Sequence, residues 1–386
     1  MNFHSRDLER VALFAATAIA ATTLFTFAAA ATPAQTFKVE TLASGLEKPW
    51  GIEVLPDDRL IITEQPGRLR IIEVDGTVGD EIAGTPTVDA RGQGGLLDIA
   101  LDPKFSENRL LYLTFAEPGR NQTNGTTAIR ARLSNDDRQL ENVEVIFRQQ
   151  PKVASTKHYG SRLVFDHDGF MFITTGERSD RPFRGQSQEL GSLLGKVIRL
   201  KSDGTIPEDN PFPNASNARP EIWSYGHRNI QGAAIHPTSG QLWTIEHGPR
   251  GGDELNIPQA GKNYGWPVVS HGVNYDGSDV GIGKETAAGM VDPIHTWTPV
   301  IAPGGMAFYG NEQFPAWNGS LFIAGMRSKA LVRLTLDGPN VISEERLLEG
   351  SHRFNDVTLG AGGVVYAVTD SEDGKVLKLI PVKPAG

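Results

Sequence analysis

The stretch GIEVLPDDRLIITEQPGRLRII, residues 51–72, contains the pattern that decides the fold. It reads as an apolar strand, a polar turn around Pro56 and Asp57, a second apolar strand, a turn at Gly67 and a third strand. Short apolar strands bounded by Pro, Asp and Gly residues are typical of β-hairpins. The stretch therefore predicts a small unit of consecutive hairpin-connected strands.

The same pattern returns five more times, at residues 96–118, 161–177, 232–248, 304–336 and 355–380. Spacings of roughly 45 to 80 residues fit four-stranded propeller blades with uneven insertions. We therefore predict an all-β fold, a six-bladed β-propeller. The strand FKVETLA, residues 37–43, precedes the first copy, so we expect it to complete the last blade and close the ring. A β-sandwich or two unrelated β domains are the alternatives, and neither requires six copies of one pattern.

The N-terminal segment has the features of a secretory signal peptide. Arg6 and Arg10 precede an apolar run at residues 11–31, and cleavage sites follow at Ala31 or Ala34. We assign residues 1–34 to the signal peptide and residues 35–386 to a single propeller domain, and we expect a bacterial periplasmic location. The alternative is an uncleaved membrane anchor. No second apolar stretch reaches the roughly 18 residues needed to cross a bilayer, so we expect no membrane span in the mature chain.

Composition narrows the possible partners and cofactors. The chain has no cysteine, which excludes disulfides, zinc–thiolate sites, iron–sulfur clusters and covalently bound haem. Its net charge is −9 and its Lys and Arg residues are scattered singly, which does not favour nucleic acid as a partner. The 43 Gly and 24 Pro residues indicate many tight turns and favour strands over helices.

Polar residues stand at matching points beside the predicted blades: Gln93, His158, Arg228, Asn229, Arg327 and Arg353. The inner strands of a propeller surround a central channel, so we expect these side chains to meet at one mouth of that channel. Solvated turn residues are the alternative explanation for each one alone. Glu177 ends the hairpin that His158 precedes, and antiparallel pairing returns it to the level of His158. A carboxylate there can hold the imidazole N–H and raise its basicity.

Two further motifs carry possible binding chemistry. SYGHRNIQG, residues 224–232, places a guanidinium beside an amide, which suits a carboxylate or a quinone oxygen. EHGPRGGDELN, residues 246–256, combines a Gly- and Pro-containing turn with Asp253 and Glu254, and backbone carbonyls with carboxylates are typical calcium ligands. A surface loop and a solvated acidic turn are the respective alternatives.

Several motifs together resemble a known family. They are PWGIEVLPDDRLIITE, GQGGLLDIALDPKF, KHYGSRLVF, LLGKVIRL, YGHRNIQG, EHGPRGGDELN and GKNYGWPVVSHGVNY. In this order they are similar to the soluble quinoprotein aldose dehydrogenases, periplasmic pyrroloquinoline quinone (PQQ) enzymes of the glucose/sorbosone dehydrogenase family. The resemblance covers residues 40–380, essentially the whole predicted propeller.

The resemblance implies a role for each matching residue. His158 matches the general base that takes the proton from the sugar C1 hydroxyl, and Arg228 faces the quinone oxygen where negative charge grows. The other matches to cofactor-binding positions are Gln93, Asn229 and Arg353. Calcium beside the cofactor is implied at the backbone carbonyls of Gly248 and Pro249. A second, structural calcium is implied at Asp253, Glu254 and Tyr264.

The sequence also departs from glucose-type members of the family. Arg327 aligns with a lysine and keeps the charge, whereas Asn355 replaces an arginine and does not, so cofactor affinity or orientation is expected to differ. Trp297 is the candidate for an aromatic that covers the sugar.

The leading function is therefore a PQQ-dependent aldose dehydrogenase. It would oxidise an aldose to its lactone and pass two electrons to an acceptor such as a quinone, a dye or a redox protein. A calcium-dependent lactonase on the same fold and a non-catalytic carbohydrate-binding propeller are the alternatives. The sequence leaves open a monomer or a homodimer.

Overall fold

A computed structural model of the protein describes residues 36–310 and 314–382. The signal peptide predicted at residues 1–34 lies outside this range and stays a prediction. Within the described ranges, every helix is too short or too polar to cross a membrane.

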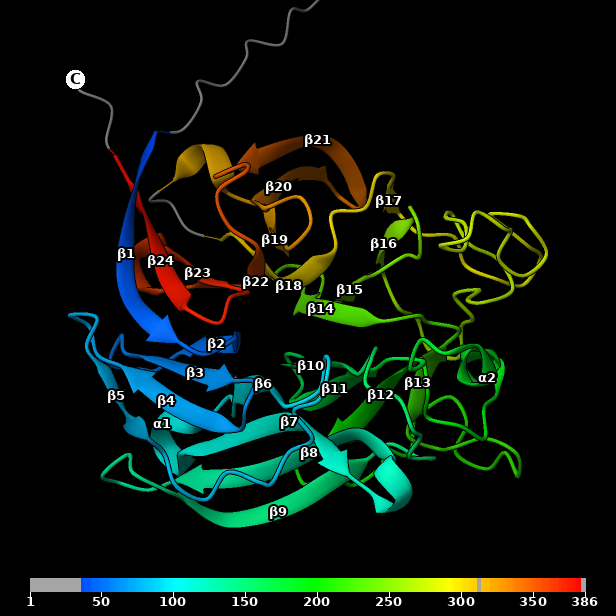
Figure 1. Cartoon of the computed structure of the whole chain (residues 1–386), viewed down its shortest axis with the longest axis horizontal. Helices are drawn as coiled ribbons and strands as arrows, with labels where there is room; N and C mark the ends of the chain where they lie inside the picture. The colour runs from blue at the N-terminus through cyan, green and yellow to red at the C-terminus, as the bar shows by residue number, and fades with distance from the viewer. Residues whose placement is uncertain (1–35, 311–313, 383–386) are drawn as a thin grey trace, which may run out of the picture. The chain divides into compact units, whose positions relative to one another are not determined.

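The described residues form six four-stranded antiparallel sheets (Figure 1). The first blade consists of β2 (Pro49–Val54), β3 (Leu60–Glu64), β4 (Arg68–Ile72) and β5 (Val78–Glu81). The second consists of β6 (Leu96–Leu101), β7 (Leu110–Pro118), β8 (Asn124–Leu133) and β9 (Leu140–Arg148). The third consists of β10 (Gly160–Phe165), β11 (Phe170–Thr175), β12 (Lys196–Lys201) and β13 (Ile222–Tyr225).

The second half of the chain repeats this arrangement. The fourth blade consists of β14 (Ile230–Ile235), β15 (Leu242–Glu246), β16 (Asp253–Asn256) and β17 (His295–Trp297). The fifth consists of β18 (Pro303–Phe308), β19 (Leu321–Gly325), β20 (Ala330–Asp337) and β21 (Asn340–Leu347). The sixth consists of β22 (Phe354–Leu359), β23 (Val365–Thr369), β24 (Gly374–Pro381) and the N-terminal strand β1 (Phe37–Leu46).

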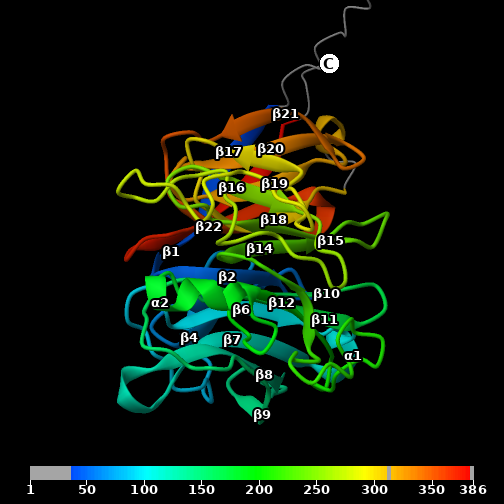
Figure 2. The same cartoon turned by 90° about the vertical axis from the view of Figure 1, so that its right-hand side faces the viewer.

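Within the described part of the chain, the helices are short and lie in the connections between strands. They are α1 (Phe105–Asn108), α2 (Arg181–Arg184) and the 3₁₀ turns η1 (Arg120–Gln122), η2 (Gly185–Gln188), η3 (Pro315–Trp317) and η4 (Ala361–Gly363). In both Figure 1 and Figure 2, α2 lies on the same side of the ring as the long loop between β16 and β17. Hydrogen bonds from α2 to this loop tie the two insertions together.

The ring closes through the N-terminal strand. β1 pairs antiparallel with β24, from Phe37 opposite Pro381 to Leu46 opposite Gly374. The innermost strands contact one another in the cyclic order β2, β6, β10, β14, β18, β22 and back to β2. The predicted six-bladed propeller and its closure by residues 37–43 are therefore confirmed.

Each pair of neighbouring blades shares one hydrophobic cluster. Between the first and second blades, for example, Ile61 and Leu69 pack with Leu111, Leu113 and Ile129. Equivalent clusters occupy the other five interfaces. No disulfide supports the ring, since the chain has no cysteine. Burial of these apolar faces therefore drives the association of the blades.

A repeated bulge shapes the start of every innermost strand. Each of these strands shows an irregular register near its first residues. In the first three blades a threonine of the second strand accepts the backbone N–H that the bulge leaves unpaired: Thr63 from Gly51, Thr114 from Asp98 and Thr174 from Arg162. Each threonine hydroxyl also donates to a carbonyl of the next blade, at Leu97, Ser161 and Ile230 respectively. Blades one to four are thus linked in series by hydrogen bonds as well as by packing.

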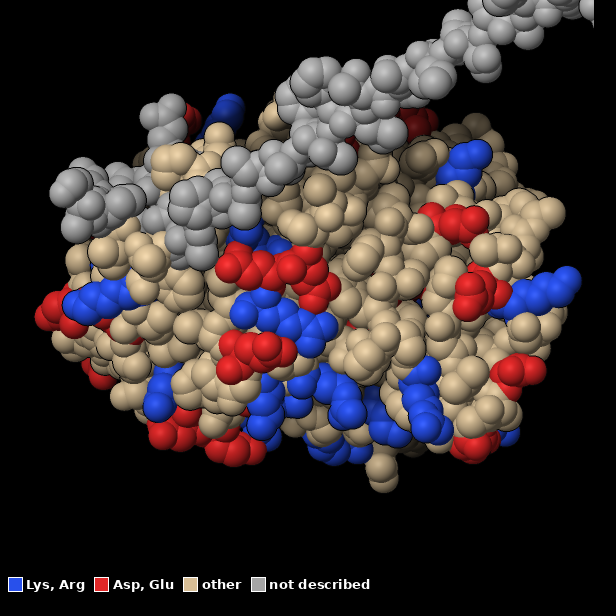
Figure 3. All heavy atoms as spheres, turned by 90° about the horizontal axis from the view of Figure 1, so that it is seen from above, with Lys and Arg blue, Asp and Glu red and all other residues tan. Residues whose placement is uncertain are grey.

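Surface charges contribute little to this architecture. On the face shown in Figure 3, acidic and basic side chains lie beside one another. Exposed ion pairs such as Lys38–Glu40 and Arg181–Asp276 are typical of such surfaces. Solvent and salt screen pairs of this kind, so the hydrophobic interfaces dominate stability.

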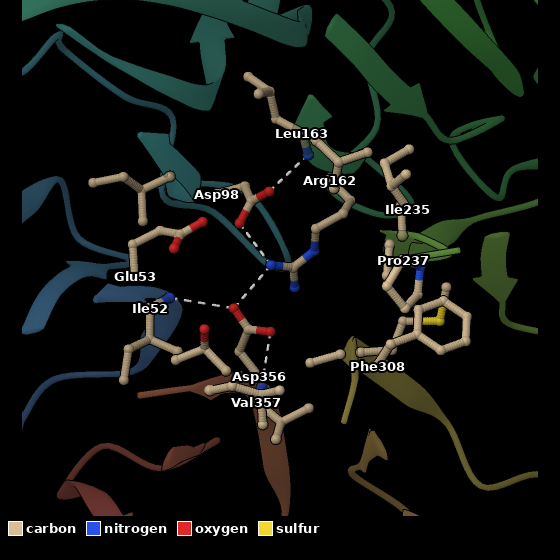
Figure 4. Close-up of a pocket in the computed structure, with 18 residues that line it drawn as sticks. Ile52, Glu53, Asp98, Arg162, Leu163, Ile235, Pro237, Phe308, Asp356 and Val357 are labelled. Carbon is tan, nitrogen blue, oxygen red and sulfur yellow. Dashed lines mark hydrogen bonds and ion pairs between the residues drawn. The ribbon is translucent and has the colours of Figure 1, made fainter. Parts of the chain in front are cut away.

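Arg162 of β10 lies in the central channel between acidic residues of two other blades (Figure 4). Its Nη1 atom donates to Asp98 Oδ1 at 2.6 Å and to Asp356 Oδ2 at 2.8 Å, and its Nε atom donates to the Gln231 carbonyl at 2.9 Å. Asp356 also accepts the backbone N–H of Ile52. This cluster therefore connects five of the six blades.

Three glycines make room for the cluster. Gly51, Gly232 and Gly305 occupy the inner-strand position that the three charged residues hold in the other blades. A Cβ atom at Gly305 would lie 1.6 Å from Asp356 Oδ1 and 2.8 Å from Arg162 Nη2. A larger residue there would displace the ion pair.

Beyond the cluster the channel opens into a pocket of about 320 Å³, lined by the later residues of the innermost strands. Burial raises the pKa of Glu53 in this pocket to about 8, and the charges of Asp98 and Asp356 add to the effect. Burial also raises the pKa values of Asp98 and Asp356, although Arg162 opposes this. The folded chain therefore retains protons here that the unfolded chain releases.

We predict that Glu53→Gln removes part of the pH dependence of stability. The pKa of Glu53 is raised from 4.5 to about 8, so the folded state binds the proton more tightly and stability falls as pH rises through this window. Thermal unfolding should show a smaller fall in Tm for Glu53→Gln than for the wild type between about pH 5 and about pH 8. Glu208→Gln, at an exposed position, is the control and should follow the wild type. Equal falls in the wild type and Glu53→Gln would contradict the prediction.

Candidate active site

A second pocket, of about 390 Å³, lies at the end of the channel where the innermost strands begin. All six blades contribute to its wall, because every innermost strand starts at this end. The sequence-predicted residues that line it are Gln93, His158, Arg228, Asn229, Gly248 and Arg353. The structure thus brings together residues that lie up to 260 positions apart in the chain.

His158 and Glu177 form a buried pair at this pocket. His158 precedes β10 and Glu177 follows β11, and the register of this hairpin places Gly160 opposite Thr175. His158 Nδ1 lies 2.7 Å from Glu177 Oε2. His158 is 7% exposed and Glu177 is fully buried. The strand pairing therefore places Glu177 at the level of His158, as the sequence predicted.

The environment keeps the imidazole of His158 neutral. Burial lowers the pKa of His158, and the nearby positive charge of Arg228 lowers it further, while Glu177 opposes both. Burial alone would raise the pKa of Glu177, but His158 and Arg228 hold it below its usual value. Glu177 is therefore ionised and accepts the Nδ1–H of a neutral imidazole. Among the described residues Nε2 has no hydrogen-bond partner, and it is the ring nitrogen left to accept a proton.

The backbone around His158 is held in an unusual conformation. His158 has φ +49°, in the left-handed region that most side chains avoid. Gln93 Oε1 accepts the His158 backbone N–H at 2.8 Å, and Asn229 Oδ1 accepts that of Gly160 at 3.0 Å. Two of the predicted cofactor-binding residues therefore also position the histidine.

Arg178 was not predicted from the sequence, and it supports the segment that leads into His158. Its side chain is fully buried and donates to the carbonyls of Asn124, Ser155 and Lys157 and to the Asn124 side chain. The guanidinium also lies 3.9 Å above the Tyr159 ring. An Arg next to an acidic residue in the sequence usually predicts an exposed ion pair. The sequence around Arg178 therefore did not indicate that its side chain is buried.

Arg228 lines the pocket and carries buried donors without a partner in the described part of the chain. It is 2% exposed, and its Nη1 atom donates to the carbonyls of His247 and Gly248 at 2.8 Å. Its Nε and Nη2 atoms are buried and have no partner among the described residues. A buried guanidinium with unpaired N–H groups is costly, so this site is suited to a ligand that supplies oxygen acceptors.

The two remaining arginine candidates, Arg353 and Arg327, and the neutral Asn355 differ in position. Arg353 lines the pocket, where both its Nε and Nη2 atoms donate to Asp370 Oδ2. Asn355 also lines the pocket and donates to the Pro49 carbonyl. Arg327 is exposed and is not among the residues that line the pocket.

The candidate calcium ligands divide into two groups. Gly248 lies in the pocket wall, whereas Pro249 is buried beside it. Asp253 accepts the backbone N–H groups of Gly248 and Ala302, both at 2.8 Å, and burial raises its pKa to about 6.

Glu254 and Tyr264 lie in a different environment. Burial raises the pKa of Glu254, and the charge of Glu246 adds to this. The Tyr264 hydroxyl donates to the Ile257 carbonyl, and the ring stacks on His227. In residues 36–310 and 314–382, no three His, Cys, Asp or Glu side chains are grouped as a metal site.

The structure corrects one expectation and adds two residues. Trp297 is 4% exposed, does not line the pocket and donates from its indole to Glu344, so it does not cover a sugar there. His247 does line the pocket, hydrogen-bonded to Gln231 at 2.8 Å, and burial lowers its pKa to about 3. Tyr275 lines the pocket and is 68% exposed. His247 belongs to the EHGPRGGDELN motif and Tyr275 ends the GKNYGWPVVSHGVNY motif, but neither motif by itself indicates that these two side chains line the pocket.

Comparisons with known proteins agree with this fold. The Glucose / Sorbosone dehydrogenase family profile matches residues 46–378. The aldose sugar dehydrogenase YliI of Escherichia coli is 43% identical over 349 residues, which cover 90% of this chain and 93% of that protein. A crystal structure of a glucose dehydrogenase is 48% identical, with a TM-score of 0.86, and covers 90% of this chain and 100% of its own. The PQQ-bound aldose sugar dehydrogenase of Streptomyces coelicolor is 29% identical, with a TM-score of 0.75, over 90% of this chain and 99% of its own. The chain belongs to the glucose/sorbosone dehydrogenase family.

Proposed function

We propose that the protein oxidises the C1 hydroxyl of an aldose sugar to the lactone, with PQQ as the resident cofactor. The observation that carries this proposal is the pairing of two features in one pocket. His158 offers a neutral imidazole oriented by Glu177, and Arg228 offers two buried N–H groups without a protein partner. A base and an unpaired cationic donor are the protein groups that a dehydrogenation to a quinone requires.

His158 would act as the general base. Its Nδ1–H is donated to Glu177, which leaves Nε2 to take the proton of the C1 hydroxyl. Glu177 then lies beside the imidazolium that forms and stabilises its charge. When bound, PQQ supplies the acceptor for the two electrons and the hydrogen that leave C1.

The pocket residues fit an anionic, oxygen-rich cofactor. Arg228 would donate through Nε and Nη2, and Gln93, Asn229 and Arg353 lie in the same wall. Arg353 would have to share its guanidinium between Asp370 and the cofactor. Arg327 would contribute only through the field of its charge or after a rearrangement, because it lies outside the pocket wall.

Calcium would bind mainly through backbone oxygens. The Gly248 carbonyl lies at the pocket, and a carbonyl keeps a second lone pair beside the hydrogen bond from Arg228. Pro249 would supply the adjoining carbonyl. For a second calcium, Glu254 fits best, because a cation would offset its repulsion from Glu246. Both Asp253 oxygens, the Tyr264 hydroxyl and Glu254 Oε2 already have hydrogen-bond partners, so each would bind calcium through a further lone pair.

Reconstitution tests the proposal directly. We predict that the protein, loaded with PQQ and Ca²⁺, reduces a dye when glucose or another aldose is added, and that omission of either PQQ or aldose abolishes dye reduction. Failure with every aldose tried would reject the dehydrogenase. Hydrolysis of a lactone in the absence of quinone would instead support the calcium-dependent lactonase.

The role of His158 can be tested by substitution, with a matched control in the same hairpin. Because His158 supplies the base, we predict that His158→Gln lowers kcat by about 10²- to 10⁴-fold while PQQ binding, followed by its absorbance, is kept. His167→Gln alters the exposed turn at the far end of the same hairpin and should leave kcat unchanged. An unchanged kcat in His158→Gln would remove this residue from the mechanism.

The pH dependence of kcat/KM tests the pairing of His158 with Glu177. Burial and Arg228 lower the pKa of His158. The imidazole therefore stays neutral at pH values below the ordinary histidine pKa of about 6.5. We predict that the acidic limb of the kcat/KM profile lies below about pH 6.5. Glu177→Gln removes a charge that raises this pKa, so the limb should move to still lower pH while kcat falls. A limb that moves to higher pH in Glu177→Gln would contradict the assigned pairing.

A further inference from the structure

Tyr275 is the exposed aromatic side chain at the mouth of the candidate active site. It is 68% exposed and lines the same pocket as His158 and Arg228. The other tyrosine or tryptophan in this wall is Trp50, which is 6% exposed and is covered by the Arg162 guanidinium at 4.6 Å. At a pocket rim, a tyrosine ring offers an apolar face and a polar hydroxyl to a ligand.

The turn that carries Tyr275 is held by its own hydrogen bonds. Asn274 donates its backbone N–H to the Ser278 carbonyl at 2.8 Å, and Gly277 donates to the Asn274 carbonyl at 2.9 Å. The Asn274 side chain donates to the Asp279 carbonyl at 2.7 Å, and Ser278 donates its N–H to Asp276 at 3.0 Å. The ring is therefore presented from a defined backbone at the tip of a closed turn.

Two neighbouring segments anchor this turn to the site. From α2, Arg184 Nη1 donates to Asn274 Oδ1 at 3.0 Å, and Arg181 pairs with Asp276 at 3.2 Å. Val273 exchanges two backbone hydrogen bonds with Arg250, in the loop that contains Gly248. The position of the Tyr275 turn is thus coupled to the segment after Glu177 and to the pocket wall.

We propose that Tyr275 binds the sugar, with its ring packed against the C–H face of a pyranose at the pocket mouth. This inference rests on the proposed function. An aromatic ring presents an apolar face with a polar hydroxyl at its edge, which matches a sugar ring whose C–H groups and hydroxyls point in different directions. Tyr275 then determines how tightly aldoses are held. It does not take part in the proton transfer at His158.

Substitution of Tyr275 separates sugar binding from chemistry. In the protein loaded with PQQ and Ca²⁺, Tyr275→Ala should raise KM for glucose by about threefold to tenfold, with kcat and PQQ affinity unchanged. Tyr275→Phe keeps the ring and should stay close to the wild type. Ile342→Ala, at a 61% exposed position on β21, is the matched surface control and should change neither constant.

Binding without turnover gives an independent readout. Methyl β-D-glucopyranoside has no free C1 hydroxyl, so it binds without being oxidised. In saturation-transfer NMR, its ring C–H protons should receive magnetisation from the wild type and Tyr275→Phe, and much less from Tyr275→Ala.

The outcomes distinguish this inference from the proposed function. Absence of aldose oxidation by the wild type would reject the proposed function itself. An active wild type with the same KM and the same saturation transfer in Tyr275→Ala would overturn the role of Tyr275 and leave the dehydrogenase standing. Loss of PQQ affinity in Tyr275→Ala would also overturn it, because the ring would then contact the cofactor.

Discussion

One buried guanidinium links most of the blades of this propeller across the central channel. Arg162 binds Asp98 and Asp356 across the central channel, and together with the backbone groups they contact, these residues connect five blades. A buried charge is tolerated only with such partners, and removal of one partner leaves an uncompensated charge that costs about 3–5 kcal/mol. The equivalent glycines in the other three blades are part of the same constraint, since a side chain at Gly305 would collide with the ion pair.

This cluster determines where the candidate active site can form. It fills the middle of the channel and separates the pocket around Glu53 from the pocket around His158. The inner strands that carry the cluster begin at the second pocket, so the residues just before them converge there. A polar site is thereby built from backbone that is fixed by the ring, with His158 held in a left-handed conformation by Gln93, Asn229 and Arg178.

Most of the fold could be predicted from the sequence because propeller blades repeat a local pattern. Strand alternation and turn residues marked all six blades, and the position of residues 37–43 predicted the closure of the ring. The charged cluster was not predicted, since Asp98, Arg162 and Asp356 lie on different blades and only the closed ring brings them into contact. The site was predicted where its residues adjoin strands, as for His158 and Arg228. Tyr275 was not predicted, because it lies in the long connection between β16 and β17, and Trp297 was wrongly expected to cover a sugar, because it is a buried residue of strand β17.

In the proposed reaction, this pocket removes hydrogen from C1 of an aldose. Single-turnover reduction of the PQQ-loaded protein by glucose, compared with glucose deuterated at C1, tests it most directly. We expect a primary isotope effect on the rate of cofactor reduction in the wild type, together with a much slower reduction in His158→Gln. Reduction at the same rate with both sugars, under conditions where substrate binding is saturated, would contradict cleavage of the C1–H bond as the step that this pocket promotes.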